Sequence, residues 1–255
     1  NANGSAASPR RGLTFVGDLA GSLSGMTVRG GVTLEGGGGI NIEDRARVAL
    51  TDVRVVDNET RGGAGGGVRV VTNSQATLLR VVVDSNRASA TQQPGGGMEV
   101  TNAAVVTMSG GSVSNNTVSD GWAGGIRVLS ASLTLDSVVV RGNRVLDGNG
   151  QGGGIQGEGA TSSITLRGTT VRENRVLASG GGLSLGSGIR AEITNSTITG
   201  NTGSLGGGIV IGNAPDARMT GTTVSDNVAT TRGGGLFVWG NSTIDIDNGI
   251  IRGNR

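Results

Sequence analysis

One short pattern returns along almost the whole sequence and limits what the chain can fold into. A glycine cluster precedes an apolar residue, as in Gly152–Ile155, and further along an apolar residue precedes an asparagine by three positions, as in Val171–Asn174. The last glycines of the clusters are Gly39, Gly67, Gly97, Gly125, Gly154, Gly182, Gly208 and Gly235. The asparagines are Asn58, Asn86, Asn116, Asn143, Asn174, Asn201, Asn227 and Asn254. Both series advance by 26 to 31 residues, which indicates stacked repeats that cannot bury their apolar faces singly.

Each repeat divides into three short segments with alternating apolar residues. In one repeat these residues are Met98 and Val100, then Val106 and Met108, then Val113. Short alternating runs rich in Val, Ile and Thr and bounded by Gly and Asn predict β-strands, and no long helical periodicity competes with them. Three strands per repeat predict an all-β fold, a right-handed parallel β-helix (solenoid) of about eight three-faced coils and about 40 Å in length.

The glycines and asparagines of the pattern have structural explanations. Glycine adopts positive φ angles and permits close approach between coils. Asparagine tolerates the left-handed region at a corner, and its amide both donates and accepts, so the asparagines of successive coils can form a ladder. We therefore expect all eight asparagines of the series to be structural. The glycine clusters are not phosphate loops, because they lead into strands and no Gly-Lys-Ser or Gly-Lys-Thr follows.

The paired pattern resembles the repeats of the chlamydial polymorphic outer membrane proteins and of other bacterial surface proteins with right-handed parallel β-helices. It is carried by Gly96-Gly97-Met98 with Val113–Asn116, and by Gly181-Gly182-Leu183 with Ile198–Asn201. The resemblance covers about residues 36–255, although the chlamydial repeats favour Phe where this chain has Val or Ile before the asparagine. It implies an exported, adhesin-like or autotransporter-like surface protein.

The composition excludes several classes of protein. The 255 residues include no Cys and no His, which excludes disulfides, thiolate metal sites and a Ser-His-Asp triad. The sequence pI near 10.7 reflects basic residues that are all Arg, since the net charge is only +2. With two Phe and two Trp, we expect no nucleic-acid surface. No run of apolar residues is long enough to span a membrane, so we expect no membrane-spanning segment. We also expect no metal and no cofactor.

The repeats suggest one domain with an irregular beginning. We interpret residues 1–35 as an N-terminal tail and an irregular first coil or cap, and residues 36–255 as the β-helix. The sequence stops inside a repeat at Ile251–Arg255. We expect the β-helix to continue in a longer protein or to be covered by another subunit, because an open coil exposes unpaired strand edges. Residues 1–12 contain no apolar segment, so we expect a mature, exported chain on a bacterial cell surface or outside the cell.

Four arginines flank the asparagines of two neighbouring coils. Arg141 and Arg144 lie one repeat before Arg172 and Arg175. Stacked guanidinium groups bind carboxylates and sulfates, so this set is a candidate site for an acidic glycan. The alternative is a solvated sheet face that discourages aggregation, with Glu173 as a counter-ion.

A second candidate lies in the last glycine repeat. If Leu236 and Val238 point inward, Phe237 and Trp239 point outward, with Val210 beside Phe237 one coil earlier. Because exposed apolar patches mark interfaces, we interpret Phe237, Trp239 and Val210 as a contact for another subunit or a further domain. Sugar stacking, or no role, are the alternatives.

One outward position carries a column of threonines: Thr77, Thr107, Thr134 and Thr165. The column then changes to Glu192, Arg218 and Asp245. The strand propensity of Thr explains the column better than a binding function does.

These observations favour a non-catalytic, exported cell-surface β-helix, either an adhesin-like stalk or passenger that binds a glycan or a host ligand, or a structural subunit that associates with itself. The alternative is a carbohydrate-active enzyme of the polysaccharide lyase or glycosidase type that acts on acidic glycans. Such an enzyme needs clustered carboxylates, or acids with Arg, on one face. The acids of this sequence look scattered, so the non-catalytic function leads.

Overall fold

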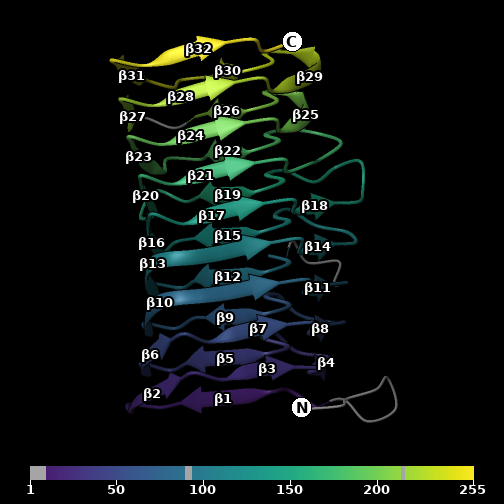
Figure 1. The fold of residues 1–255 in the computed structure, drawn as a ribbon, viewed down its shortest axis with the longest axis vertical. Helices are drawn as coiled ribbons and strands as arrows, with labels where there is room; N and C mark the ends of the chain where they lie inside the picture. The colour runs from purple at the N-terminus through teal and green to yellow at the C-terminus, as the bar shows by residue number, and fades with distance from the viewer. Residues whose placement is uncertain (1–9, 90–93, 214–215) are drawn as a thin grey trace.

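The computed structural model of the chain describes residues 10–89, 94–213 and 216–255, and every regular element in them is a β-strand. Equivalent strands of successive repeats pair in parallel and in register, as Ile155 pairs with Leu183. The chain is therefore a parallel β-solenoid whose coils stack along one axis, with the termini at opposite ends (Figure 1). It has about nine coils, slightly more than the repeat count predicts.

The first face of each coil belongs to a nine-stranded sheet. Its strands, in spatial order, are β1 (Leu13–Val16), β5 (Ile40–Glu43), β9 (Val68–Val70), β12 (Met98–Thr101), β15 (Ile126–Leu129), β19 (Ile155–Glu158), β22 (Leu183–Gly186), β26 (Ile209–Gly212) and β30 (Leu236–Trp239).

The second and third faces belong to one sixteen-stranded sheet that turns a corner, called the bent sheet below. Its first face contains β2 (Ala20–Ser24), β6 (Arg47–Thr51), β10 (Gln75–Asp84), β13 (Val105–Ser114), β16 (Ser132–Asp136), β20 (Ser163–Arg167), β23 (Arg190–Thr194), β27 (Asp216–Thr220) and β31 (Ile244–Asp247). Its second face contains β3 (Thr27–Arg29), β7 (Arg54–Val56), the ends of β10 and β13, β17 (Val139–Arg141), β21 (Thr170–Arg172), β24 (Thr197–Thr199), β28 (Thr223–Ser225) and β32 (Ile250–Arg252).

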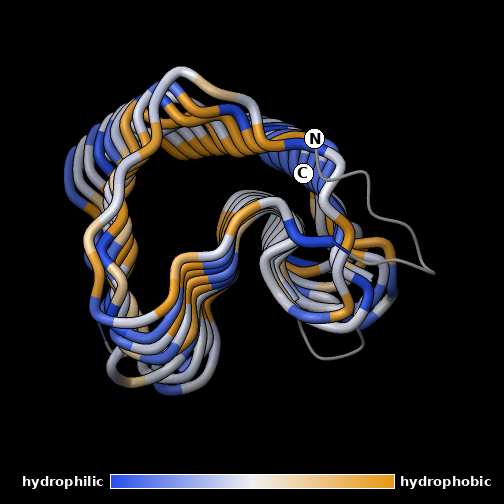
Figure 2. Tube along the Cα trace, turned by 90° about the horizontal axis from the view of Figure 1, so that it is seen from below, coloured by the Kyte–Doolittle hydropathy of each residue, from blue (hydrophilic) through white to orange (hydrophobic). Residues whose placement is uncertain are grey.

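Most segments that lead into a glycine cluster contain a further short strand that the sequence does not predict. A five-stranded sheet, called the edge sheet below, contains β4 (Val32–Thr33), β8 (Glu59–Thr60), β11 (Arg87–Ala88), β14 (Thr117–Val118) and β18 (Arg144–Val145), and a two-stranded sheet contains β25 (Thr202–Leu205) and β29 (Val228–Arg232). These strands lie along one side of the stack in Figure 1, and the view along the axis shows a smaller lobe beside the main loop of each coil (Figure 2).

The first coil is more regular than its sequence suggests. Leu13 pairs with Ile40 in the nine-stranded sheet, and Val28 pairs with Val55 in the bent sheet. Its short strands therefore take the same places as those of the later coils, which accounts for the additional coil. Residues 1–9 of the expected tail lie outside the described residues.

The core is a continuous column of aliphatic side chains inside the coils. The alternating residues of each strand supply it, so Ile155, Ile164 and Leu166 of one coil are all fully buried. Because nearly identical side chains repeat from coil to coil, each residue packs against its own counterparts above and below.

The asparagine ladder is present, although the left-handed corner lies one residue earlier than predicted. The side-chain amide of Asn116 donates to Oδ1 of Asn143, and that of Asn143 donates to Oδ1 of Asn174, at 2.9–3.0 Å. The positive φ belongs to the preceding residue, such as Asn115 or Gly142. The ladder asparagines themselves do not need the left-handed region, so their function is to satisfy buried backbone groups.

Candidate functional site

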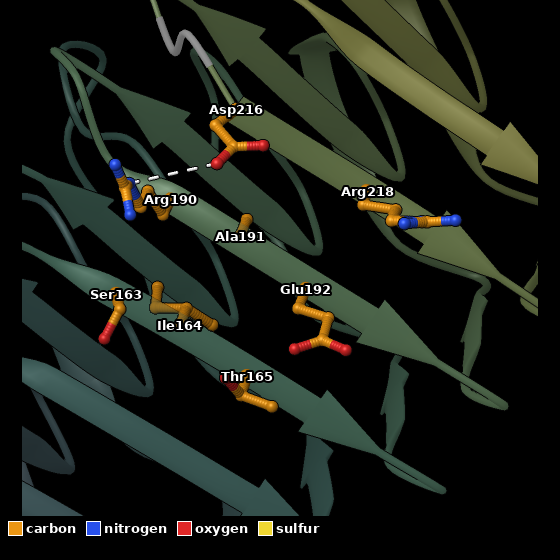
Figure 3. A pocket seen from close by; sticks show the side chains of 8 residues that line it. All are labelled: Ser163, Ile164, Thr165, Arg190, Ala191, Glu192, Asp216 and Arg218. Carbon is orange, nitrogen blue, oxygen red and sulfur yellow. Dashed lines mark ion pairs between the residues drawn. The ribbon is translucent and has the colours of Figure 1, made fainter.

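A shallow depression on the first face of the bent sheet gathers four charged outward side chains. It has a volume of about 330 Å³. Strands β20, β23 and β27 line it, and Figure 3 shows their side chains in three rows, with Ser163 and Thr165 on the first strand. The charged residues are Arg190, Glu192, Asp216 and Arg218. The depression begins where the threonine column ends, because Thr165 pairs in register with Glu192.

The four charges alternate in two directions. Arg190 pairs in register with Asp216, and Glu192 pairs with Arg218, so opposite charges are neighbours across the strands as well as along them. Arg190 Nε lies 3.8 Å from a carboxylate oxygen of Asp216 (Figure 3). The buried Ala191 and Ala217 lie between the charged residues and anchor the two strands in the core. The stacked backbone therefore holds the four groups in a fixed pattern.

Two of the four charged groups remain available to a ligand. Across residues 10–89, 94–213 and 216–255, neither Glu192 nor Arg218 forms an ion pair, and both side chains are exposed. Neighbouring parallel strands are about 4.8 Å apart, so one ligand can contact both groups at once. A carboxylate, a guanidinium and the hydroxyls of Ser163 and Thr165 together suit a ligand rich in hydroxyl groups with charged substituents.

A second polar cluster lies inside the molecule, on the side of the nine-stranded sheet that faces away from the aliphatic core. Arg127, in the middle of β15, donates to Glu99 of β12 at 3.0 Å and to Glu158 at the end of β19 at 3.2 Å. Glu99 is only 2% exposed, and its second carboxylate oxygen accepts the backbone N–H of Gly95 at 3.0 Å. The Arg127 guanidinium also lies 5.5 Å from the centre of the Trp122 ring, within the range of a cation–π contact.

The charged cluster continues towards the N-terminal coils. Arg69 of β9 donates to Asn41 at 3.2 Å and to Glu43 at 3.3 Å. A second depression of about 380 Å³ opens here, and Arg69, Glu99 and Glu35 are among its lining residues. The buried polar column therefore reaches the surface at one place between the glycine loops and the nine-stranded sheet.

Burial dominates the protonation of Glu99. The loss of solvent raises the pKa of its carboxyl group above the ordinary value, while the charge of Arg127 and the N–H of Gly95 act in the opposite direction. The carboxylate thus stays paired in an environment that disfavours its charge.

The glycine clusters explain why these outward side chains are buried. In several coils, the second residue of the strand in the nine-stranded sheet lies against the glycine two positions before the last glycine of its cluster. A Cβ atom on Gly152 would lie 2.7 Å from Cβ of Gln156, and one on Gly180 would lie 2.8 Å from Cβ of Ser184. The chain thus folds back over the strand, and a glycine at this position leaves room for the covered side chain. In the coil of Arg127 the small, buried Ala123 takes this position instead. The acidic and basic residues one repeat apart, Glu99 and Arg127, were the signal available in the sequence.

The four arginines of the proposed glycan site occupy two different sheets. Arg141 pairs in register with Arg172 in the bent sheet, and Arg144 forms a bridge with Arg175 beside the edge sheet. Arg172 donates to Glu173 at 2.6 Å, as the alternative interpretation expects for a counter-ion. The corner residue Asn143 separates the two pairs along the chain. Binding of an acidic glycan to this set stays a prediction.

The aromatic candidates are brought together as expected, with different exposures. Phe237 pairs in register with Val210, which is only 5% exposed because it packs beneath Gly206. Trp239 is 50% exposed, and its ring lies over Gly212. The exposed part of this patch is therefore Trp239 and part of Phe237, while Val210 supports it from below.

Within the described residues, no group of three or more acidic side chains is placed to hold a metal ion. The described part of the chain also has no helix that is long and apolar enough to cross a membrane. The chain matches no protein-family model, no curated protein and no solved structure.

Proposed function

We propose that this chain is a non-catalytic part of an exported cell-surface protein, an adhesin-like stalk or passenger whose stacked sheets present ligand-binding groups at fixed spacing. The observation that carries the proposal is the depression on β20, β23 and β27. There, Glu192 and Arg218 lie side by side without an ion pair to any described residue, on strands anchored in the core. Preorganised groups of this kind lose little conformational entropy when a ligand binds.

Direct binding measurements test the proposal. The immobilised chain is exposed to polygalacturonate, hyaluronan and heparin, with neutral dextran as a reference. We expect at least one charged polysaccharide to bind, and the double substitution Glu192→Gln with Arg218→Gln to weaken that binding at least tenfold. The matched control replaces the exposed Arg29–Asp57 ion pair with Gln and Asn. Equal loss in both variants, or no binding at all, would count against the depression as a binding site.

One observation favours the carbohydrate-active alternative. Glu192 and Asp216, which look scattered in the sequence, line the same depression together with two arginines. Paired carboxylates of this kind serve glycosidases as acid and base or nucleophile. If the chain is an enzyme, incubation with the same polysaccharides yields new reducing ends or unsaturated products, and Glu192→Gln or Asp216→Asn abolishes them. Binding without products supports the non-catalytic function.

A further inference from the structure

The outer surface of the lobe carries one small tile of two arginines and two leucines. Arg144 and Leu146 project from one coil, and Arg175 and Leu177 from the next, so that arginine follows arginine and leucine follows leucine. Together with Val145 they line a depression of about 210 Å³ whose exposed surface is mostly apolar.

The two leucines are exposed to a degree that the fold does not require. Leu146 is 53% exposed and Leu177 is 50% exposed. The equivalent positions of the two preceding coils are Ser89 and Ser119, because the backbone N–H groups of Ser89, Ser119 and Leu146 each bond to the coil before in the same way. The apolar pair is therefore a local feature of these two coils and not part of the repeat.

The two arginines lack counter-ions in the structure. Neither Arg144 nor Arg175 forms an ion pair with any acidic residue of the described chain, and both are exposed. Their backbones are held one strand spacing apart by the bridge between them. The other two arginines of the set differ in this respect, since Arg172 is paired with Glu173 and Arg141 lies beside it in the bent sheet.

Positive charge beside an apolar surface complements one class of ligand. We propose that the tile of Arg144, Leu146, Arg175 and Leu177 binds a free aliphatic carboxylate, a single short acyl chain with an anionic head. The two guanidinium groups take the carboxylate, and the leucines with Val145 take the chain. The small volume suits one chain and not a membrane surface, and the apolar lining disfavours a glycan.

A series of soluble probes tests this assignment by calorimetry. Hexanoate, octanoate and decanoate differ only in chain length. We expect the affinity to rise about fourfold for each methylene that is buried, until the depression is full. Decyltrimethylammonium has the same chain with the opposite charge, and a heparin-derived disaccharide has the charge without the chain. Neither should compete with decanoate.

Matched substitutions locate the site. Arg144→Gln with Arg175→Gln, and separately Leu146→Ser with Leu177→Ser, should each weaken decanoate binding at least tenfold. The serine substitutions copy the residues of the preceding coils, and circular dichroism verifies that the variants remain folded. The control, Arg141→Gln with Arg172→Gln, removes the same number of charges on the other side of the corner and should leave binding unchanged.

Several outcomes would overturn the proposal. These are no binding of decanoate below its solubility limit, equal affinity for all three chain lengths, or equal loss in the control variant. Binding to vesicles that contain anionic lipid, without binding of free decanoate, would assign the tile to a membrane surface instead. Binding of the disaccharide at the same tile would return it to the acidic-glycan prediction.

Discussion

Each asparagine of the ladder satisfies several buried polar groups at once. Oδ1 of Asn116 accepts both the backbone N–H and the side-chain amide of Asn86, and its own amide also donates to the carbonyl of Val83. The amide offers one acceptor oxygen and two N–H donors on a short side chain, so one residue serves all of these groups. The residue thereby closes the corner of the coil and joins it to the next.

Replacement of one ladder residue should affect two coils. Asn116→Ala removes the acceptor of the Asn86 backbone N–H and the side-chain donor to the carbonyl of Val83, while the Asn86 amide keeps its bond to Val55, and each buried orphaned group costs about 1–3 kcal/mol. We expect a clear loss in the free energy of unfolding, measured with urea. The control is Asn115→Gly, which keeps the positive φ and removes only an exposed bond to Asp84. A similar loss in both variants would contradict the assigned function of the ladder.

The glycines of the repeat are required for two different reasons. Gly168 has a φ of +53°, at the corner inside the bent sheet, and a Cβ atom there would find its nearest neighbour at 3.6 Å. Gly154 has no positive φ, but a Cβ atom would lie 2.6 Å from the carbonyl oxygen of Gly182 and 2.9 Å from the amide nitrogen of Asn174. Gly168 is therefore favoured by its backbone conformation, whereas Gly154 is required because neighbouring coils approach closely there.

One substitution made at both positions separates these reasons. Asn tolerates the left-handed region, and Asn195 already occupies the position equivalent to Gly168 with a φ of 49°. We expect Gly168→Asn to change the free energy of unfolding by less than about 1 kcal/mol. Gly154→Asn should destabilise by about 1–3 kcal/mol or prevent folding, because the backbone must move. Thermal unfolding of both variants measures the difference, and a reversed order would refute the explanation.

At the scale of the element, the inner strands of the nine-stranded sheet, such as β12, β15 and β26, are buried on both faces. Ile126 and Val128 of β15 face the aliphatic core, while Arg127 between them lies beneath the glycine loops. A buried charge needs a partner, and Arg127 has Glu99 and Glu158. In β12 and β15, the inward side chains therefore belong to the aliphatic core, and the outward Glu99 and Arg127 belong to a buried polar cluster on the other side of the sheet.

The buried ion pair should show strong coupling between its members. Arg127→Met leaves Glu99 buried without its cation and should cost about 3–5 kcal/mol, whereas the double substitution Glu99→Met with Arg127→Met should cost less than the single one. The control is Arg80→Met, which breaks an exposed pair with Asp52 and should leave stability almost unchanged. Urea unfolding of the wild type, Arg127→Met, Glu99→Met, the double variant and Arg80→Met measures the coupling. Additive losses would mean that the pair does not act as a unit.

The raised pKa of Glu99 predicts a pH dependence with a defined sign. The folded protein holds the Glu99 proton more tightly than the unfolded chain, whose pKa is near the ordinary 4.5. The contribution of this group to stability is thus fully present below that value and is lost as the pH rises through the raised folded pKa. Glu99→Gln removes the titration, so the stability of the wild type relative to this variant should fall as pH rises from 4 to 8. A constant or rising difference would contradict the assignment.

At the scale of the whole molecule, the stack protects every coil that has neighbours on both sides. Val224 of β28 is fully buried, whereas its register partner Ile251 in the last coil is 50% exposed. Val238 and Ile246 in the last coil are likewise exposed, while their partners Ile211 and Met219 are buried. The exposed end combines core-type side chains with unpaired strand edges, and both favour association.

A polypeptide of these 255 residues should therefore associate with itself in a concentration-dependent way. Sedimentation velocity over a concentration series, with negative-stain images, should show species longer than the single rod. Val238→Thr with Ile251→Thr keeps the β-branched shape and reduces the apolar surface, so it should shift the equilibrium towards the monomer. Trp239→Ser tests the aromatic patch separately. A monomer at all concentrations would exclude association through this end.

The candidate site was only partly accessible from the sequence. The column from Thr165 to Glu192 and Arg218 follows from the repeat period, since equivalent positions of neighbouring coils must lie side by side. Arg190 and Asp216 form a second column beside it. They complete the depression because β23 and β27 pair in register. The repeat period places Glu99 beside Arg127, but the burial of the two residues could not be recognised, because their cover comes from the path of the glycine loops.

The sequence alone determined the solenoid, its parallel strands and its asparagine ladder, because each depends on a local pattern that repeats at a nearly constant interval. The tertiary structure decided which outward residues are exposed. Glu99 and Trp239 both alternate with core residues, yet a glycine loop folds over Glu99, whereas Trp239 is half exposed. Burial on the outer face depends on segments distant in sequence and on neighbouring coils, and no local alternation of apolar and polar residues encodes it.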